Sequence, residues 1–253
     1  MARKFSRRRL LAGLGLAVSM PVLSACDRLG QTSAFRSFLT LGEWLAYRVH
    51  RTIGPSAMAT EYPESQLSPV FRTNGNTRPT SGDYHRHASN GFAGWRLKID
   101  GLVVAPQSLS LADLRRLPSR TQITRHDCVE GWSAIGKWTG VPLGALLDRA
   151  QLKPEARFIV FHCADDFRGT PYYESIDLVD AFHPQTILAY AMNGKDLPMG
   201  HGAPLRLRLE RQLGYKHAKF VMRVEAVRSF AEIGRGRGGY WEDQGDYDWY
   251  AGI

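Results

Sequence analysis

The chain has 253 residues, enough for one substantial domain and a leader, and its composition is that of a soluble globular protein rather than a disordered or collagen-like one. Its net charge of +9 is concentrated at the start, because residues 1–25 hold five basic residues and no acidic one. Subtracting these five from the 33 basic residues leaves 28 against 24 acidic residues, a balance that gives no support for nucleic-acid binding.

Residues 1–25 have the pattern of a signal peptide. Paired arginines follow Ser6, and the apolar run Leu11 to Val22 is too short for a comfortable transmembrane span, which is typical of a twin-arginine signal. Leu23-Ser24-Ala25-Cys26 resembles a lipobox, and Asp27 resembles an inner-membrane retention signal. The alternative is an ordinary cleavage site with Cys26 incidental. We expect export by the twin-arginine route to the periplasmic side of the inner membrane, with a lipid anchor at Cys26.

Residues 26–68 are expected to form an N-terminal helix and a wrapping segment. Apolar residues recur at roughly helical spacing from Phe35 to Ile53, which predicts an amphipathic helix. Such a helix could lie on a membrane surface or pack against the domain, and we expect packing because it is the commoner case. Pro55 to Pro69 is rich in Ser and Pro and is predicted to be extended.

Residues 69–233 are expected to form a single mixed α+β domain, because many short strands alternate with few short helices. Ser110 is predicted to cap a short helix. The His85-x-His87 pair has no obvious third ligand nearby, so a surface loop or a phosphate contact is favoured over zinc. Residues 234–239 are predicted to be a Gly/Arg linker, and the aromatic, acidic tail up to residue 253 is expected to wrap over the core. The strand predictions cover residues 95–104, 121–124, 157–161, 186–192, 205–209 and 219–230.

Cys128 lies in a short polar run, Arg125 to Trp132, which we expect to be a loop at the end of a strand. One interpretation is a buried structural cysteine. However, Arg125 and His126 are close in sequence and would favour the thiolate, which is a soft ligand suited to a redox-active metal. A disulfide between Cys128 and Cys163 would consume this ligand. We therefore take Cys128 as the candidate metal ligand and catalytic residue.

The segment Cys128-Val-Glu-Gly-Trp132, followed by Trp138-Thr-Gly-Val-Pro-Leu143, resembles the molybdenum-ligand segment of the sulfite oxidase superfamily. It is most similar to the branch of bacterial periplasmic methionine sulfoxide reductase catalytic subunits (MsrP type). The resemblance runs from about Pro69 to about Val227. It implies the molybdopterin-binding fold of that superfamily and a molybdenum–molybdopterin cofactor whose metal is bound by Cys128. It also implies an oxidoreductase that transfers an oxygen atom in two-electron steps.

The resemblance further implies which residues contact the cofactor. They lie in three segments of the chain and at one separate position, which is often Thr in the family. These residues are Arg72 and Asn74 in an early loop, Cys163 at the separate position, His201 and Arg206 in the second segment, and His217, Ala218 and Lys219 in the third, which reaches the phosphate.

Motifs for haem attachment, iron–sulfur clusters, dinucleotides and P-loops are absent from the sequence, so a single redox centre must exchange electrons with another protein. We expect a membrane electron-transfer partner, with a haem protein as one option, and a monomer, since little chain follows the core. Glu130 would repel an anion and Trp132 offers an apolar wall, so reduction of small or protein-bound S-oxides or N-oxides is favoured, although Lys137 is a nearby cation. The alternatives are a sulfite-oxidising enzyme of the same fold and a non-catalytic ligand-binding lipoprotein.

Overall fold

A computed structural model describes residues 32–253, so the predicted signal peptide and Cys26 lie outside the described residues. The chain divides into two compact units, one up to His50 and one from Arg51 to Ile253. The described part of the first unit is helix, belonging to α2 (Ser33–Ile53), which confirms the helix predicted there. Within residues 32–253, no helix has both the length and the apolar character needed to cross a membrane.

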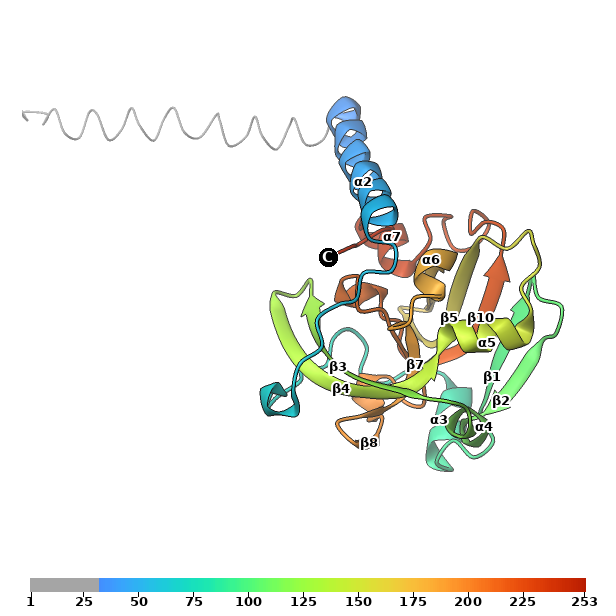
Figure 1. Ribbon diagram of the computed structural model, residues 1–253. Helices are drawn as coiled ribbons and strands as arrows, with labels where there is room; N and C mark the ends of the chain where they lie inside the picture. Colours follow the sequence, from blue (N-terminus) through green and yellow to red (C-terminus); the bar gives the residue numbers. More distant parts are fainter. Residues whose placement is uncertain (1–31) are drawn as a thin grey trace, which may run out of the picture. The chain divides into compact units, whose positions relative to one another are not determined.

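The second unit is built mainly from two five-stranded sheets (Figure 1). All strand pairs are antiparallel except β1 and β10, which are parallel. The first sheet has the order β2 (Gln107–Ser110), β1 (Arg96–Gly101), β10 (Val221–Val227), β5 (Phe158–Phe167) and β6 (Thr170–Asp177). The second has the order β3 (Arg120–Cys128), β4 (Trp132–Pro142), β7 (Ile187–Met192) and β8 (Lys195–Asp196), and β9 (Arg206–Arg208) also pairs with β7.

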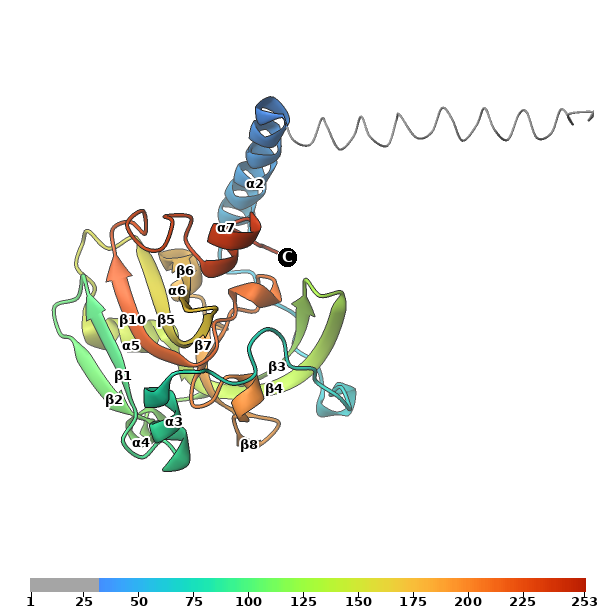
Figure 2. The same cartoon turned by 180° about the vertical axis from the view of Figure 1, so that it is seen from behind.

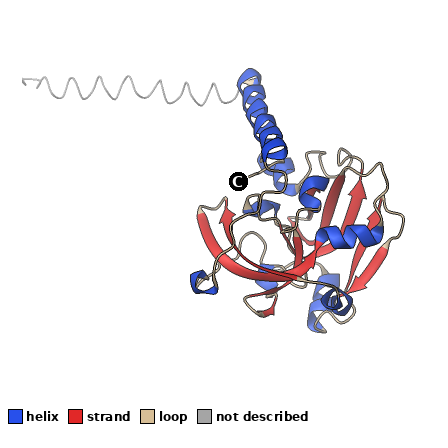
Figure 3. Ribbon diagram, in the orientation of Figure 1, coloured by secondary structure: helices blue, strands red, loops and turns tan. Residues whose placement is uncertain are grey.

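Short helices surround these strands, as Figure 3 shows. Seen from behind in Figure 2, the long β3–β4 hairpin curves away from the sheet that contains β1 and β10. The helical elements are η1 (Glu64–Gln66), α3 (Gly82–Ser89), α4 (Leu111–Arg116), α5 (Leu143–Ala150), α6 (Leu178–Ala181), η2 (Met199–His201), η3 (Gly214–Lys216) and α7 (Tyr240–Gly245).

One apolar core joins the two sheets. Leu97 and Val224 of the first sheet, Leu188 of the second and Leu146 of α5 all belong to the same cluster of buried side chains. At Gly140, β4 shifts register against β7, and an added Cβ would lie 2.2 Å from the carbonyl oxygen of Leu188. Only glycine therefore permits this approach of the two strands, which fixes the far end of the hairpin that carries Cys128.

Local signals in the sequence correspond well to several of these elements. Ser110 and Asp113 form the capping box of α4, as the predicted capped helix requires. The predicted strand over 186–192 is β7, and the Asn193-Gly194 turn that follows joins it to β8. The mixed α+β class is confirmed.

Other expectations were wrong in detail. The run around Cys128 is not a loop, since β3 continues to Cys128, whose partner across the hairpin is Trp132; Gly131, at a φ of +84°, allows so tight a turn. The His85-x-His87 pair lies in helix α3, which Ser81 caps, and not in a loop. The strand predicted over 157–161 is too short, because β5 continues through residues 162–166 with a register shift.

Candidate active site

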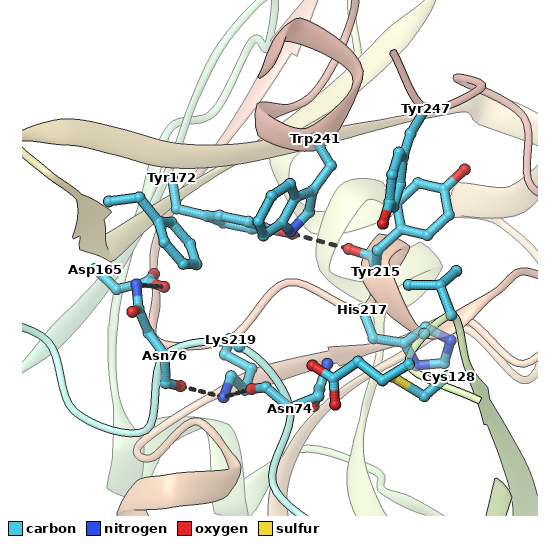
Figure 4. Close-up of a pocket in the computed structure, with 15 residues that line it drawn as sticks. Asn74, Asn76, Cys128, Asp165, Tyr172, Tyr215, His217, Lys219, Trp241 and Tyr247 are labelled. Carbon is cyan, nitrogen blue, oxygen red and sulfur yellow. Dashed lines mark hydrogen bonds between the residues drawn. The ribbon is translucent and has the colours of Figure 1, made fainter. Parts of the chain in front are cut away.

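A cavity of about 220 Å³ opens beside the end of the β3–β4 hairpin (Figure 4). Its walls come from parts of the chain that are distant in sequence. They comprise Cys128 to Glu130, the loop 74–76, residues of β5 and β6, the segment from Gly214 to Lys219, and the C-terminal residues Trp241 and Tyr247. In Figure 4, Cys128 and His217 lie at one end of the cavity and Asp165 at the other, with Lys219 and Asn74 between them.

Cys128 is buried, and both cysteines in the described residues, Cys128 and Cys163, are free thiols. Burial raises the pKa of the Cys128 thiol, and the Glu130 carboxylate adds to the rise, whereas the Glu130 backbone N–H and Arg206 lower it. Arg125 is exposed and pairs with Asp127 at 3.0 Å. Burial also lowers the pKa of His126 well below its usual range, so its imidazole is neutral. The interpretation that Arg125 and His126 promote the thiolate is therefore wrong.

Two arginines of β9 are fully buried near the cavity. Arg208 forms a bidentate ion pair with Glu210 and lies over the ring of Trp138 at 4.4 Å. Arg206 donates from Nη1 to the His201 carbonyl at 3.3 Å, but its Nε and Nη2 atoms have no partner. Burial lowers the pKa of Arg206 to about 9, and Arg208 contributes to this. Arg206 is thus a buried cation that still requires an acceptor.

Three neutral imidazoles accompany these arginines. His126 accepts from Arg208 at 3.1 Å through Nδ1 and leaves Nε2 without a partner. His201 likewise has an unpartnered Nδ1, and burial lowers its pKa to about 4. Both ring nitrogens of His217 form hydrogen bonds with backbone atoms, with distances of 3.0 and 3.4 Å. His126 and His201 can therefore bond a ligand, while His217 serves as a wall.

Lys219 joins two of the cofactor segments to each other. Its ammonium donates to the Asn74 carbonyl at 2.6 Å, to the Gly200 carbonyl at 3.1 Å and to the Asn76 carbonyl. Burial lowers its pKa to about 7, with Arg206 adding to the effect. The lysine thus holds the loop 74–76 against η2 and presents a cationic centre at the cavity wall.

The structure brings most of the predicted cofactor residues together but not all of them. Cys128, Asn74, His217 and Lys219 line the cavity, and His201 and Arg206 lie against each other beside them. The three others lie differently. Arg72 is exposed and lies outside the lining. The N–H and carbonyl of Ala218 form hydrogen bonds of 3.1 and 2.8 Å to other backbone groups of the fold. Cys163 lines a second cavity, of about 420 Å³. Tyr172 lines both cavities.

Further residues that line the cavity could not be recognised from the sequence. Asp165 is buried, its Oδ1 has no partner, and burial raises its pKa to about 6. Asn76 donates to its other oxygen at 3.1 Å. The only signal for Asp165 was the polar run from His162 to Asp166, which is equally compatible with a surface loop. Trp241 and Tyr247 belong to the tail, where their aromatic character gave no indication of a cavity.

These unpartnered atoms test whether the site fits a molybdopterin cofactor. Arg206 offers two donor atoms, Asn74 and Asp165 each have a free side-chain oxygen, and His126 and His201 each have a free ring nitrogen. An apolar ligand would leave all of them buried and unsatisfied, which is costly. A large anionic group with donors and acceptors on its edges satisfies them, and Cys128 adds the sulfur ligand that a soft metal requires. The residues present fit the cofactor.

Comparisons with known proteins point to the same cofactor. Residues 85–232 match the family model of the oxidoreductase molybdopterin binding domain. A putative protein-methionine-sulfoxide reductase subunit YedZ1 of Azospira oryzae is 40% identical over 198 residues, which cover 78% of this chain and 69% of that protein. The protein-methionine-sulfoxide reductase catalytic subunit MsrP of Ralstonia nicotianae is 30% identical over 238 residues, covering 87% of this chain and 68% of that protein.

The MsrP of Xanthomonas axonopodis pv. citri is 37% identical over 149 residues, which cover 54% of this chain and 46% of that protein, so the match spans about half of the relative. The crystal structure of the sulfane dehydrogenase SoxCD from Paracoccus pantotrophus is similar with a TM-score of 0.49 and 27% identity, covering 53% of this chain and 38% of that one. The family match and the relatives bear out the resemblance on which the cofactor prediction rested. The chain belongs to the molybdopterin-binding oxidoreductase family, as an enzyme that uses a molybdenum–molybdopterin cofactor.

Proposed function

We propose that this enzyme reduces neutral S-oxides or N-oxides, with methionine sulfoxide, free or in proteins, as the leading substrate. Cys128 is the metal ligand in this proposal. Arg206, His201 and Lys219 hold the anionic and acceptor edges of the pterin, and Asn74 and Asp165 hold its donor edges. The cofactor supplies the two-electron oxygen-atom chemistry. The sulfoxide takes up two electrons and two protons, and a thioether and water are the products.

The observation that carries the choice of substrate is the position of Glu130. Its carboxylate lies on the cavity wall two residues after Cys128 and acts electrostatically on both the Cys128 thiol and Lys219. Sulfite, a dianion near neutral pH, would meet a like charge there, whereas a neutral oxide would not. Lys137, the cation that left the choice open, forms an ion pair with Glu64 and is not part of the lining.

The aromatic wall above Cys128 supports the same choice. Trp241 and Tyr247 stack with ring centroids 5.9 Å apart, and Tyr215 packs edge-on against Tyr247 at 4.9 Å. All three side chains line the cavity. Flat apolar faces bind methyl and thioether groups well, and sulfur makes favourable contacts with aromatic rings. In this proposal the wall would receive the two carbon substituents of the sulfoxide.

A turnover assay tests this proposal. The molybdenum-loaded enzyme is supplied with a reduced dye and with methionine sulfoxide, dimethyl sulfoxide or trimethylamine N-oxide; in parallel it receives sulfite and an oxidised acceptor. We expect reduction of at least one of the oxides and little turnover of sulfite. Efficient sulfite oxidation without any oxide reduction would overturn the assignment.

The proposal extends to partner and location. The names of the relatives describe them as subunits, and this sequence has motifs for only one redox centre, so electrons must come from another protein, for which we infer a membrane electron-transfer protein. Export by the twin-arginine route and lipidation at Cys26 would bring the enzyme to that partner. Substituting Arg7→Lys and Arg8→Lys should then trap a cofactor-loaded precursor in the cytoplasm. Finding no acyl group on the mature chain by mass spectrometry would remove the anchor from the account.

A further inference from the structure

Large apolar side chains lie along one side of α2 and are exposed. They are Phe38, Leu39, Leu41, Leu45, Val49 and Ile53, all between 48% and 82% exposed. With 3.6 residues per turn, they fall within roughly half of the helix circumference and form a continuous stripe of about four turns. These six side chains are exposed on the helix itself, which gives α2 the amphipathic character expected from the sequence. Exposed apolar areas of this kind mark interaction surfaces.

The last turn of α2, which belongs to the second unit, shows which side of the helix the protein uses. Arg51 forms ion pairs with Asp177 at 3.0 Å and with Asp180 at 2.6 Å. Ile53 lies about 200° further around the helix and is 82% exposed. At this turn a polar residue contacts the second unit, while Ile53, the last apolar residue of the stripe, is exposed.

The residues around the stripe are suited to a bilayer surface. Trp44 is half exposed, and the Arg48 guanidinium lies 5.2 Å from the centre of its ring. Tryptophan and arginine are the residues that sit at the polar boundary of a membrane. Residues 26–53 contain four arginines and two acidic residues. Because Arg51 is paired with Asp177 and Asp180, three arginines remain, and this slight positive balance favours an anionic leaflet.

The distance along the chain also favours the membrane. Helix α2 begins at Ser33, seven residues after Cys26, so the intervening chain spans at most about 25 Å. An acyl chain at Cys26 would therefore keep the start of α2 close to the lipid surface. Several acyl chains hold a protein on a bilayer where one is marginal, so a lipidated Cys26 would keep α2 within reach of the headgroups.

We propose that α2 lies on the surface of an anionic bilayer with its apolar stripe inserted at the level of the lipid headgroups. The proposal deepens the proposed location at the inner membrane and depends on it for its biological setting. The physical claim can be tested without the acyl chain, which separates its failure from a failure of the lipidation proposal.

The experiment uses the cofactor-loaded chain from residue 26 onward with Cys26→Ser, which cannot be acylated. It is mixed with vesicles of phosphatidylcholine containing about one third phosphatidylglycerol, and binding is measured by flotation. We expect the protein to float with these vesicles. The double variant Leu41→Gln with Leu45→Gln should bind at least about tenfold more weakly, because it removes two inserted leucines while keeping good helix formers.

The matched control is Val70→Gln with Val104→Gln, at two exposed apolar positions outside α2, and it should bind like the parent protein. Melting temperature and dye-linked activity should be unchanged in both variants. Three results would overturn the proposal. These are an absence of vesicle binding by the parent protein, equal binding by the α2 variant, or light scattering that shows a dimer which only the α2 variant dissociates, because the stripe would then belong to a second copy of the chain.

Discussion

Replacing Arg206 by methionine should have opposite effects on the cofactor-free and cofactor-loaded protein. Without the cofactor, the guanidinium is fully buried and two of its three nitrogens have no partner. A fall of its pKa from 12.5 to about 9 corresponds to roughly 4–5 kcal/mol of unfavourable free energy for the charge. Relaxation and water entry reduce the recoverable part, so we expect Arg206→Met to stabilise the cofactor-free protein by about 1–3 kcal/mol.

With the cofactor bound, the same substitution removes charge-assisted hydrogen bonds to it. Bonds of this kind contribute about 1.5–3 kcal/mol each, so the cofactor should dissociate on the order of ten to a hundred times faster. Thermal unfolding of protein made with and without cofactor synthesis measures the first effect. The rate at which pterin is lost on dilution measures the second.

Arg208→Met is the matched control. Arg208 is equally buried but is fully paired with Glu210 at 2.6 Å, so its removal leaves a buried carboxylate uncompensated. That variant should be destabilised by about 3–5 kcal/mol with or without the cofactor. If Arg206→Met destabilises the cofactor-free protein as much as Arg208→Met does, the inference that Arg206 awaits an anionic ligand is refuted.

Three further predictions concern Asp165, Lys216 and Trp241. Burial raises the pKa of Asp165 to about 6 in the folded, cofactor-free protein, compared with 3.8 in the unfolded chain, so the folded protein holds the carboxyl proton more tightly. About 3 kcal/mol of stability that is present below pH 4 is therefore lost as the pH rises through 6. Denaturant titrations of Asp165→Asn should lack this fall, and an identical pH dependence would contradict it. Lys216 is buried between Glu174 and Glu242, so Lys216→Met should lower the free energy of unfolding by about 3–5 kcal/mol, and a loss under 1 kcal/mol would contradict a stabilising role for these two ion pairs. Trp241→Ala should raise KM for methionine sulfoxide about tenfold with a smaller change in kcat, and an unchanged KM would remove the aromatic wall from substrate binding.

The sequence predicts elements well where the signal is local. The strand β7 is a continuous apolar run, the turn after it is Asn193-Gly194, and Ser110 with Asp113 forms a capping box. Each signal comes from residues within a few positions of one another, so it can be recognised without knowledge of distant contacts. The segment after Cys128 was informative for a similar reason, because the proposed metal ligand and its flanking residues are contiguous.

The burial of Arg206 and Arg208 could not be predicted in the same way. Their alternation with leucines is the pattern of a strand with one exposed face. In the fold, Trp138 of β4 covers that face, with the two guanidinium groups 5.3 and 4.4 Å from its ring. The burial thus depends on a strand about 70 residues earlier, and no property of β9 alone reveals it.

The aromatic wall of the cavity was missed for a related reason. Trp241 and Tyr247 come from a tail whose position depends on long-range contacts, above all the pairing of Glu242 with Lys216. The Gly/Arg segment before it is held by Asp243, which accepts the N–H groups of Arg235 and Arg237 at 2.8 and 3.1 Å. A flexible linker was therefore the wrong expectation for this segment, since one carboxylate orders it.

The central claim is that Cys128 binds the catalytic metal while other residues hold the pterin, and one variant tests it directly. Cys128→Ser, produced with the cofactor machinery, should keep the melting temperature and most of the pterin content of the parent protein, because Arg206, His201 and Lys219 are untouched. Its reduction of methionine sulfoxide by a reduced dye should fall by at least about a thousandfold, since the thiolate that tunes the metal is gone. Activity within a few-fold of the parent enzyme would contradict the assignment of Cys128 as the metal ligand.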